Sequence, residues 1–69
     1  MDAKKVGQKL ASLRKSRNLT KKQVSKDTGC SYKSICSYEY GTRIPNDDVK
    51  QKLANYFNAS VVDIFFDNE

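Results

Sequence analysis

LTKKQVSKDTGCSYKSICSYEYG, residues 19–41, predicts two short helices joined by a tight turn. Thr20 and Gln23 have the spacing of a capping box, in which the threonine hydroxyl accepts from the third helical N–H and the glutamine side chain reaches back. Gly29 suits the left-handed backbone that commonly ends a helix. We therefore expect a helix over residues 21–28.

The second helix of this stretch is expected over residues 32–40. Ser31 can cap its beginning, Ile35 and Tyr38 repeat at the spacing of a buried helix face, and Gly41 can end it. A connection this short forces a sharp angle between the two helix axes, so the second helix can project from the body of the protein. The stretch therefore has the organisation of a helix-turn-helix.

Three more helices, and no strand, are expected outside this stretch. The first, over residues 3–16, has a regularly spaced apolar face made by Val6, Leu10 and Leu13. Asn46 can cap a helix over residues 47–57, which follows the loop around Pro45. The apolar face of that helix is expected to comprise Val49, Leu53, Tyr56 and Phe57. Ser60 and Asp63 form a last capping motif before a helix over residues 61–66. The predicted fold class is an all-α, compact five-helix bundle.

Length and charge set further limits. The 69 residues are expected to form one domain, 1–69, that buries only about 60% of the surface of its unfolded chain and leaves no room for an effector domain. Residues 1–45 contain 11 Lys and Arg against 3 acidic residues, a net charge of +8. Residues 46–69 contain 2 Lys against 5 acidic residues, a net charge of −3. A polyanion is therefore attracted to the first two-thirds of the chain, although lysine-rich helices can also be merely soluble.

With this helix-turn-helix pattern, the chain resembles the XRE family of helix-turn-helix regulators. The positions that match the family motif are Leu19, Thr20, Gly29, Ser31, Ile35, Glu39 and Gly41. Residues 6–14 and 45–65 resemble the family's other helices, so the resemblance covers roughly the whole chain. It implies a lambda repressor-like fold and a sequence-specific transcriptional regulator, expected to repress as a homodimer on a palindromic operator in double-stranded DNA. A protein-interaction or antitoxin-like module that keeps the fold is the alternative.

The resemblance implies that the helix over residues 32–40 enters the major groove. Base contacts are expected from Tyr32, Lys33, Ser34 and Ser37. Phosphate contacts are expected from Thr20, Lys21, Lys22, Tyr40, Thr42 and Arg43. Lys33 can donate to guanine O6 and N7, whereas Tyr32 can pack on a thymine methyl, bind a phosphate or pack against the neighbouring turn.

Two positions depart from the family pattern. Lys21 stands where the family often has a glutamine that contacts DNA and braces the start of the next helix. A lysine cannot reproduce a bidentate amide contact, so we expect a phosphate contact there. Tyr38 replaces an aliphatic residue, which implies either a larger slot in the core or an exposed hydroxyl.

Arg14 and Glu39 match positions where the family commonly has an ion pair between its first and third helices. A guanidinium and a carboxylate can pair through two parallel hydrogen bonds. We expect a partly buried structural pair, in which loss of one partner costs about 3–5 kcal/mol. A solvated surface pair, the alternative, contributes less than about 1 kcal/mol.

The segment VVDIFF, residues 61–66, carries more apolar side chains than a short helix can turn toward one core. In one interpretation, Val61, Ile64 and Phe65 complete the core and the other apolar side chains lie on the surface. In the other, the segment forms a two-fold interface, because exposed apolar patches often mark partner sites. We expect the homodimer interface to contain Val61, Val62, Phe65 and Phe66, a surface that also suits a protein partner.

Other functional classes find little support in the sequence. The chain has no histidine, no Gly-rich phosphate loop and no nucleophile with a base partner, so neither an enzyme nor a cofactor or metal site is expected. Cys30 is expected to be a small core hydrophobe, and Cys36 to be more exposed, where a redox role is possible. No signal sequence or membrane span is recognised, and a cytoplasmic location is expected.

Overall fold

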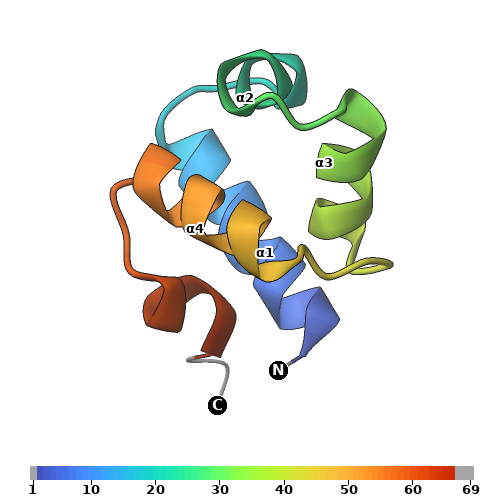
Figure 1. Cartoon of the computed structure of the whole chain (residues 1–69). Helices are drawn as coiled ribbons and strands as arrows, with labels where there is room; N and C mark the ends of the chain where they lie inside the picture. Colours follow the sequence, from blue (N-terminus) through green and yellow to red (C-terminus); the bar gives the residue numbers. More distant parts are fainter. Residues whose placement is uncertain (1, 67–69) are drawn as a thin grey trace.

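The computed structural model describes residues 2–66, and Figure 1 shows helices wrapped around a shared core. The helices are α1 (Ala3–Ser16), α2 (Lys21–Thr28), α3 (Tyr32–Tyr40), α4 (Asp47–Tyr56) and a short π-helical segment, η1 (Val62–Phe66). None of the residues that the structure describes lies in a strand. The prediction of an all-α fold with five helices is confirmed.

The helix ends follow local capping signals. Four predicted N-cap side chains each accept a hydrogen bond from the backbone N–H three residues later, at 2.9–3.1 Å: Thr20, Ser31, Asn46 and Ser60. Gly29 and Gly41 end α2 and α3 with φ angles of 77° and 78°, in the left-handed region. Because both ends of α2 and of α3 are capped, the turn between these helices is sharply defined.

The capping box predicted at the start of α2 is only half formed. The backbone N–H of Gln23 donates to Thr20 Oγ1 at 3.1 Å, as predicted. The side chain of Gln23 does not reach back, however, and its Nε2 donates to Asp27 Oδ1 at 2.8 Å. A carboxylate one helical turn away is the stronger acceptor, because a hydrogen bond to a charged group is stronger than one between neutral groups.

The buried face of α4 is rotated relative to the prediction. Leu53, Ala54 and Phe57 are buried, whereas Val49 and Tyr56 are only partly buried. The helix ends at Tyr56 rather than at residue 57, and Phe57 is its C-cap. Lys50 occupies the remaining inward position, with only 9% of its surface exposed, and its long aliphatic stem fills space in the core.

The last segment is π-helical rather than the α-helix expected over residues 61–66. Ile64 and Phe65 are adjacent in the sequence and both are buried, with 1% and 0% of their surfaces exposed. A π-helical turn is wider than an α-helical turn, so successive side chains point in more similar directions. The wide turn thus lets this segment place two neighbouring large side chains in the same core.

A close approach of the two backbones fixes α3 against α1. Gly7 lies in α1 where the two helices cross, and a Cβ atom at this position would lie 2.6 Å from the carbonyl oxygen of Tyr38. The two backbones can approach this closely only because glycine has no side chain. The side chain of Tyr38 is 4% exposed, so it occupies a slot in the core. The core residues are Val6, Leu10, Val24, Ile35, Tyr38, Leu53, Ala54, Phe57, Ile64 and Phe65.

Candidate nucleic-acid interface

Arg14 and Glu39 form a bidentate pair beneath the helix-turn-helix. Arg14 Nε donates to Glu39 Oε2 at 2.7 Å, and Arg14 Nη2 donates to Glu39 Oε1 at 3.0 Å. Arg14 Nη1 also donates to the carbonyl oxygen of Leu19 at 2.9 Å, and the hydrogen bonds to Glu39 raise the pKa of Arg14. The two side chains are 12% and 8% exposed. The pair joins α1, the loop before α2 and α3, so it holds α3 at a fixed angle.

The predicted base contacts at the beginning of α3 are more exposed than those further along the helix. Lys33 is exposed, and Tyr32 is 48% exposed. A hydrogen bond with the thiol of Cys36, one turn later, raises the pKa of Tyr32, while the charge of Lys21 opposes this rise. Tyr32 and Cys36 lie one helical turn apart on the same face of α3.

The two serines of the predicted base-reading set are partly buried. The hydroxyl of Ser34 is held by Ser31 Oγ at 2.9 Å and by Arg43 Nη1 at 3.5 Å. The backbone carbonyl of Ser37 accepts from Thr42. Ser34 is therefore less exposed than Lys33, and its hydroxyl already accepts two hydrogen bonds.

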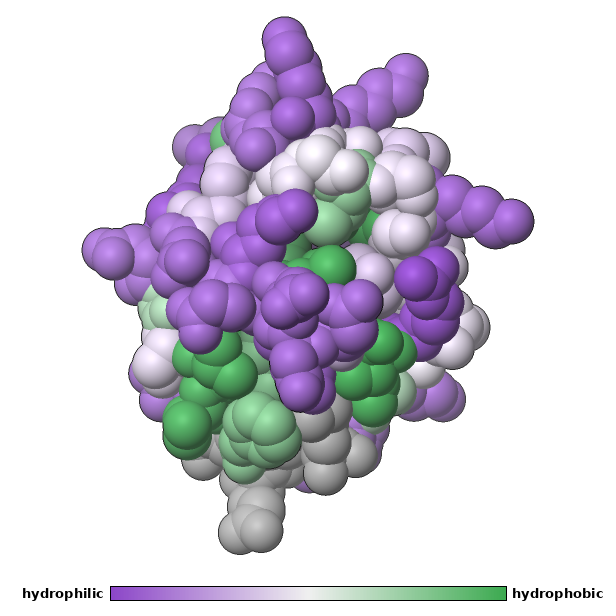
Figure 2. All heavy atoms as spheres, in the orientation of Figure 1, coloured by the Kyte–Doolittle hydropathy of each residue, from purple (hydrophilic) through white to green (hydrophobic). Residues whose placement is uncertain are grey.

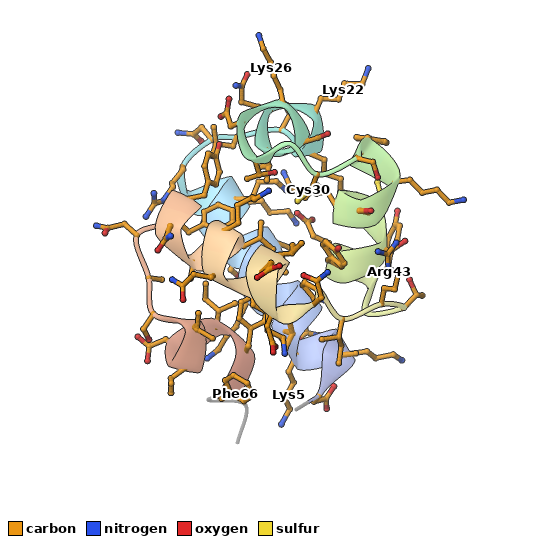
Figure 3. The ribbon with its side chains drawn as sticks, viewed as in Figure 1. Lys5, Lys22, Lys26, Cys30, Arg43 and Phe66 are labelled. Atoms are coloured by element: carbon orange, nitrogen blue, oxygen red, sulfur yellow. The ribbon has the colours of Figure 1, made fainter. Side chains whose placement is uncertain are left out.

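The predicted phosphate contacts surround α3 on two sides. Thr20 and Lys22 are exposed at the start of α2, and Figure 3 shows Lys22 pointing outward from that helix. Because the Thr20 hydroxyl acts as an acceptor for Gln23, its proton is available to a phosphate oxygen. The Nζ atom of Lys21 lies 4.8 Å from the ring centroid of Tyr40, which is 69% exposed.

The loop after α3 begins with hydrogen bonds from Thr42 back to that helix. The backbone N–H of Thr42 donates to the carbonyl oxygen of Ser37 at 3.1 Å, and its hydroxyl donates to the same oxygen at 3.2 Å. Both donors of Thr42 therefore bond to the last turn of α3 in the free protein, and its phosphate contact stays a prediction. Arg43 lies over the Tyr38 ring at 5.4 Å, beside α3 in Figure 3.

The C-terminal apolar segment is divided between core and surface. Val62 and Phe66 are 61% and 54% exposed, and Val61 is partly buried. Phe65 is fully buried, so its predicted place in a dimer interface is wrong: its ring packs inside its own chain. Figure 2 shows apolar side chains at the surface of the lower part of the molecule, where η1 lies in Figure 1.

Sequence reasoning missed a cation that supports this apolar surface. The Nζ atom of Lys50 lies 5.2 Å and 6.0 Å from the ring centroids of Phe66 and Phe65, and 3.6 Å from Asp47 Oδ1. The signal was present, because position 50 shares one helix face with the buried residues Leu53 and Phe57. Lys50 therefore fixes the orientation of an exposed ring.

The cysteines and metal-ligating side chains form no further site in the part of the chain that the structure describes. Cys30 and Cys36 are free thiols, and both are partly buried. Cys30 packs against the core, and its carbonyl oxygen accepts from Ser25 Oγ at 2.5 Å. Within residues 2–66 no three potential metal ligands gather. No helix among these residues has the length and apolarity to cross a membrane.

Comparison with known proteins connects this geometry to a family. A family model described as a helix-turn-helix domain matches residues 7–65. Neither the curated proteins nor the solved structures compared with the chain include a significant match. The matched residues cover most of α1, all of α2, α3 and α4, and most of η1. Helix-turn-helix domains suggest a DNA-binding regulator. The chain belongs to the helix-turn-helix domain family, and within it to the XRE type.

Proposed function

We propose that this protein is a sequence-specific regulator that binds double-stranded DNA through the major groove. The observation that carries the proposal is the placement of α3. Its inner residues Ile35 and Tyr38 are buried, while Lys33 and Tyr32 at its N-terminal end are exposed. In helix-turn-helix proteins the N-terminal residues of the second helix contact base edges. Lys33 is the proposed base reader, and Tyr32, Ser34 and Ser37 lie close to it on α3.

The charge distribution supports the same orientation. Residues 1–45 carry a net charge of +8, whereas residues 46–69 carry −3. Thr20, Lys21 and Lys22 lie at the start of α2, where unpaired backbone N–H groups and the helix dipole favour an anion. Together with Tyr40 they are the proposed phosphate contacts. Figure 3 shows Lys22 and Lys26 projecting from the end of the molecule opposite Phe66.

We further propose that two copies bind a palindromic operator and repress by covering it. The exposed side chains of Val62 and Phe66 both belong to the short segment η1 and support a two-fold interface, because an exposed apolar patch on a small protein often marks a partner site. A dimer of this kind places its recognition helices about 34 Å apart, which is one duplex turn.

Selection of bound sequences from a random DNA pool tests this proposal. We expect enrichment of one short sequence in two inverted copies about 10 base pairs apart. Affinity for the selected operator should fall steeply with salt, since phosphate-bound cations are released on binding. No enrichment and no salt-dependent binding would refute the DNA-binding proposal and favour a protein-interaction module that uses Val62 and Phe66. Enrichment of a single, unrepeated site would refute the palindromic dimer.

A further inference from the structure

The ammonium group of Lys21 rests on an aromatic ring contributed by another helix. Lys21 is the first residue of α2, and Tyr40 is the last residue of α3. The Nζ atom lies 4.8 Å from the centroid of the Tyr40 ring, within the range of a cation–π contact. Lys21 is partly buried although the ring beneath it is 69% exposed, so the lysine leans toward α3 rather than into solvent.

The ring belongs to a row of side chains along one face of α3. Tyr32, Cys36 and Tyr40 follow one another at intervals of four residues, so they lie one above another on the helix. The charge of Lys21 also acts on Tyr32, whose pKa it lowers against the effect of Cys36. The ammonium group therefore lies alongside this row, between the start of α2 and the outer surface of α3.

A lysine that must bind a phosphate benefits from such support. Its four-carbon stem is flexible, and a free side chain loses this freedom when it binds. A ring that attracts the ammonium group already holds the side chain near its bound conformation. The lysine then loses less conformational freedom on binding, and its affinity for phosphate is higher. The ring contacts one side of the ammonium, which leaves N–H donors on its other side for phosphate oxygens.

We infer that Tyr40 is a positioning residue for Lys21, and that its ring holds the ammonium group where the DNA backbone passes the junction of α2 and α3. The inference rests on the proposed DNA binding. Lys21 replaces the glutamine that braces the start of α3 in the family pattern. In this chain Lys21 instead makes a cation–π contact with Tyr40, the last residue of α3.

A double-mutant cycle measures this positioning. Affinity for the selected operator is measured by fluorescence anisotropy for the wild type, Lys21→Ala, Tyr40→Leu, Tyr40→Phe and the two corresponding double variants. Tyr40→Phe keeps the ring, so Lys21→Ala should reduce affinity by the same factor in that background as in the wild type. Tyr40→Leu removes the ring, and there Lys21→Ala should cost about 2–5-fold less.

Lys22 provides the matched control. It is the next residue of α2 and is exposed, and Figure 3 shows that it points outward. The affinity lost through Lys22→Ala should be the same in the wild-type and Tyr40→Leu backgrounds. If Tyr40→Leu changes the cost of both lysine substitutions equally, or changes neither, the inference is refuted. It is equally refuted if Lys21→Ala has no effect on affinity.

An NMR measurement on the free protein separates this inference from the DNA-binding proposal. The ε-methylene protons of Lys21 should show an upfield ring-current shift that persists in Tyr40→Phe and disappears in Tyr40→Leu. If this shift is present but no DNA binds, the proposed function fails while the Lys21 contact stands. If operator binding is normal but the shift is absent from the wild type, Tyr40 does not position Lys21.

Discussion

Glu39 accepts two hydrogen bonds from the guanidinium group of Arg14, at 2.7 and 3.0 Å, and through them α3 is attached to α1. The same guanidinium donates to the carbonyl oxygen of Leu19, just before α2. Both charged side chains are almost fully removed from solvent, at 12% and 8% exposure. Because three elements meet at one mostly buried charge pair, the orientation of α3 and the stability of the fold depend on the same contact.

Glu39→Ala should therefore unfold the domain rather than only weaken DNA binding. The substitution leaves the Arg14 guanidinium mostly buried without its counter-charge, which costs about 3–5 kcal/mol of unfolding free energy. Chemical denaturation followed by circular dichroism measures this loss. Asp48→Ala, at an exposed position in the first turn of α4, is the control and should cost less than about 1 kcal/mol. Equal midpoints for Glu39→Ala and the wild type would show that the pair is not structural.

Gly7→Ala should destabilise the protein, contrary to the helix propensity of alanine. In an exposed helix this change stabilises by about 1 kcal/mol. Here the added Cβ would lie 2.6 Å from the Tyr38 carbonyl oxygen, and backbone atoms cannot move aside as a side chain can. We expect a loss of about 1–3 kcal/mol as α1 and α3 separate. Ser12→Ala, an exposed change on the same helix, should alter stability by less than about 0.5 kcal/mol. A rise in thermal midpoint for Gly7→Ala would contradict the close approach.

The helix-turn-helix could be predicted from sequence because its boundaries are encoded locally. Each cap at Thr20, Ser31, Gly29 or Gly41 involves residues close together in the chain, so residue type and spacing are sufficient. Contacts between segments far apart in the sequence were harder to predict. The burial of Lys50 depends on aromatic rings of η1, and the contact of Lys21 with Tyr40 depends on the angle between two helices.

The placement of Phe65 and the bonds of Thr42 have the same origin. Phe65 was expected at an interface because six consecutive residues offered more apolar side chains than an α-helix can direct inward. The wider turn of η1 changes which of these side chains reach the core. The phosphate contact of Thr42 stays a prediction, but in the free protein both of its donors bond to a carbonyl oxygen that the end of α3 leaves unpaired. Motif position alone predicts neither outcome.

Tyr56 should titrate at an unusually high pH. Burial and its hydrogen bond to Asp27 Oδ2, at 2.6 Å, raise the pKa of Tyr56 from 10.0 to about 12. Because the folded state holds the phenol proton more tightly, this stabilisation is complete below pH 10 and is lost as the pH rises toward 12. Tyrosinate absorbance should show one late step that Tyr56→Phe removes. Asp27→Asn should lower its midpoint. A Tyr56→Phe variant that loses an early step instead would contradict the assignment.

Lys33 and Lys22 should differ in what their removal does to DNA binding. Lys33→Ala should relax base preference at one position of each half-site, since a good contact to a base pair discriminates by about 1–3 kcal/mol. Lys22→Ala should weaken binding to all sequences alike and reduce the slope of log affinity against log salt by about 0.9. Repeated selection and salt titration with each variant provide both measurements. Identical behaviour of the two variants on every site would show that Lys33 is not a base reader.

Phe66→Glu should convert the proposed dimer to a monomer without unfolding it. The ring is 54% exposed, so a charged residue there is easily hydrated in the monomer but strongly unfavourable within an apolar interface. Ile44→Glu, at an exposed apolar position in the loop after α3, is the control and should remain dimeric. Equilibrium sedimentation at tens of micromolar gives the mass of each variant, and circular dichroism confirms folding. Because Phe66 lies at the opposite end of the molecule from Lys22, a monomeric variant should still bind a single half-site with reduced affinity. A wild-type protein that is already monomeric under these conditions would refute the interface.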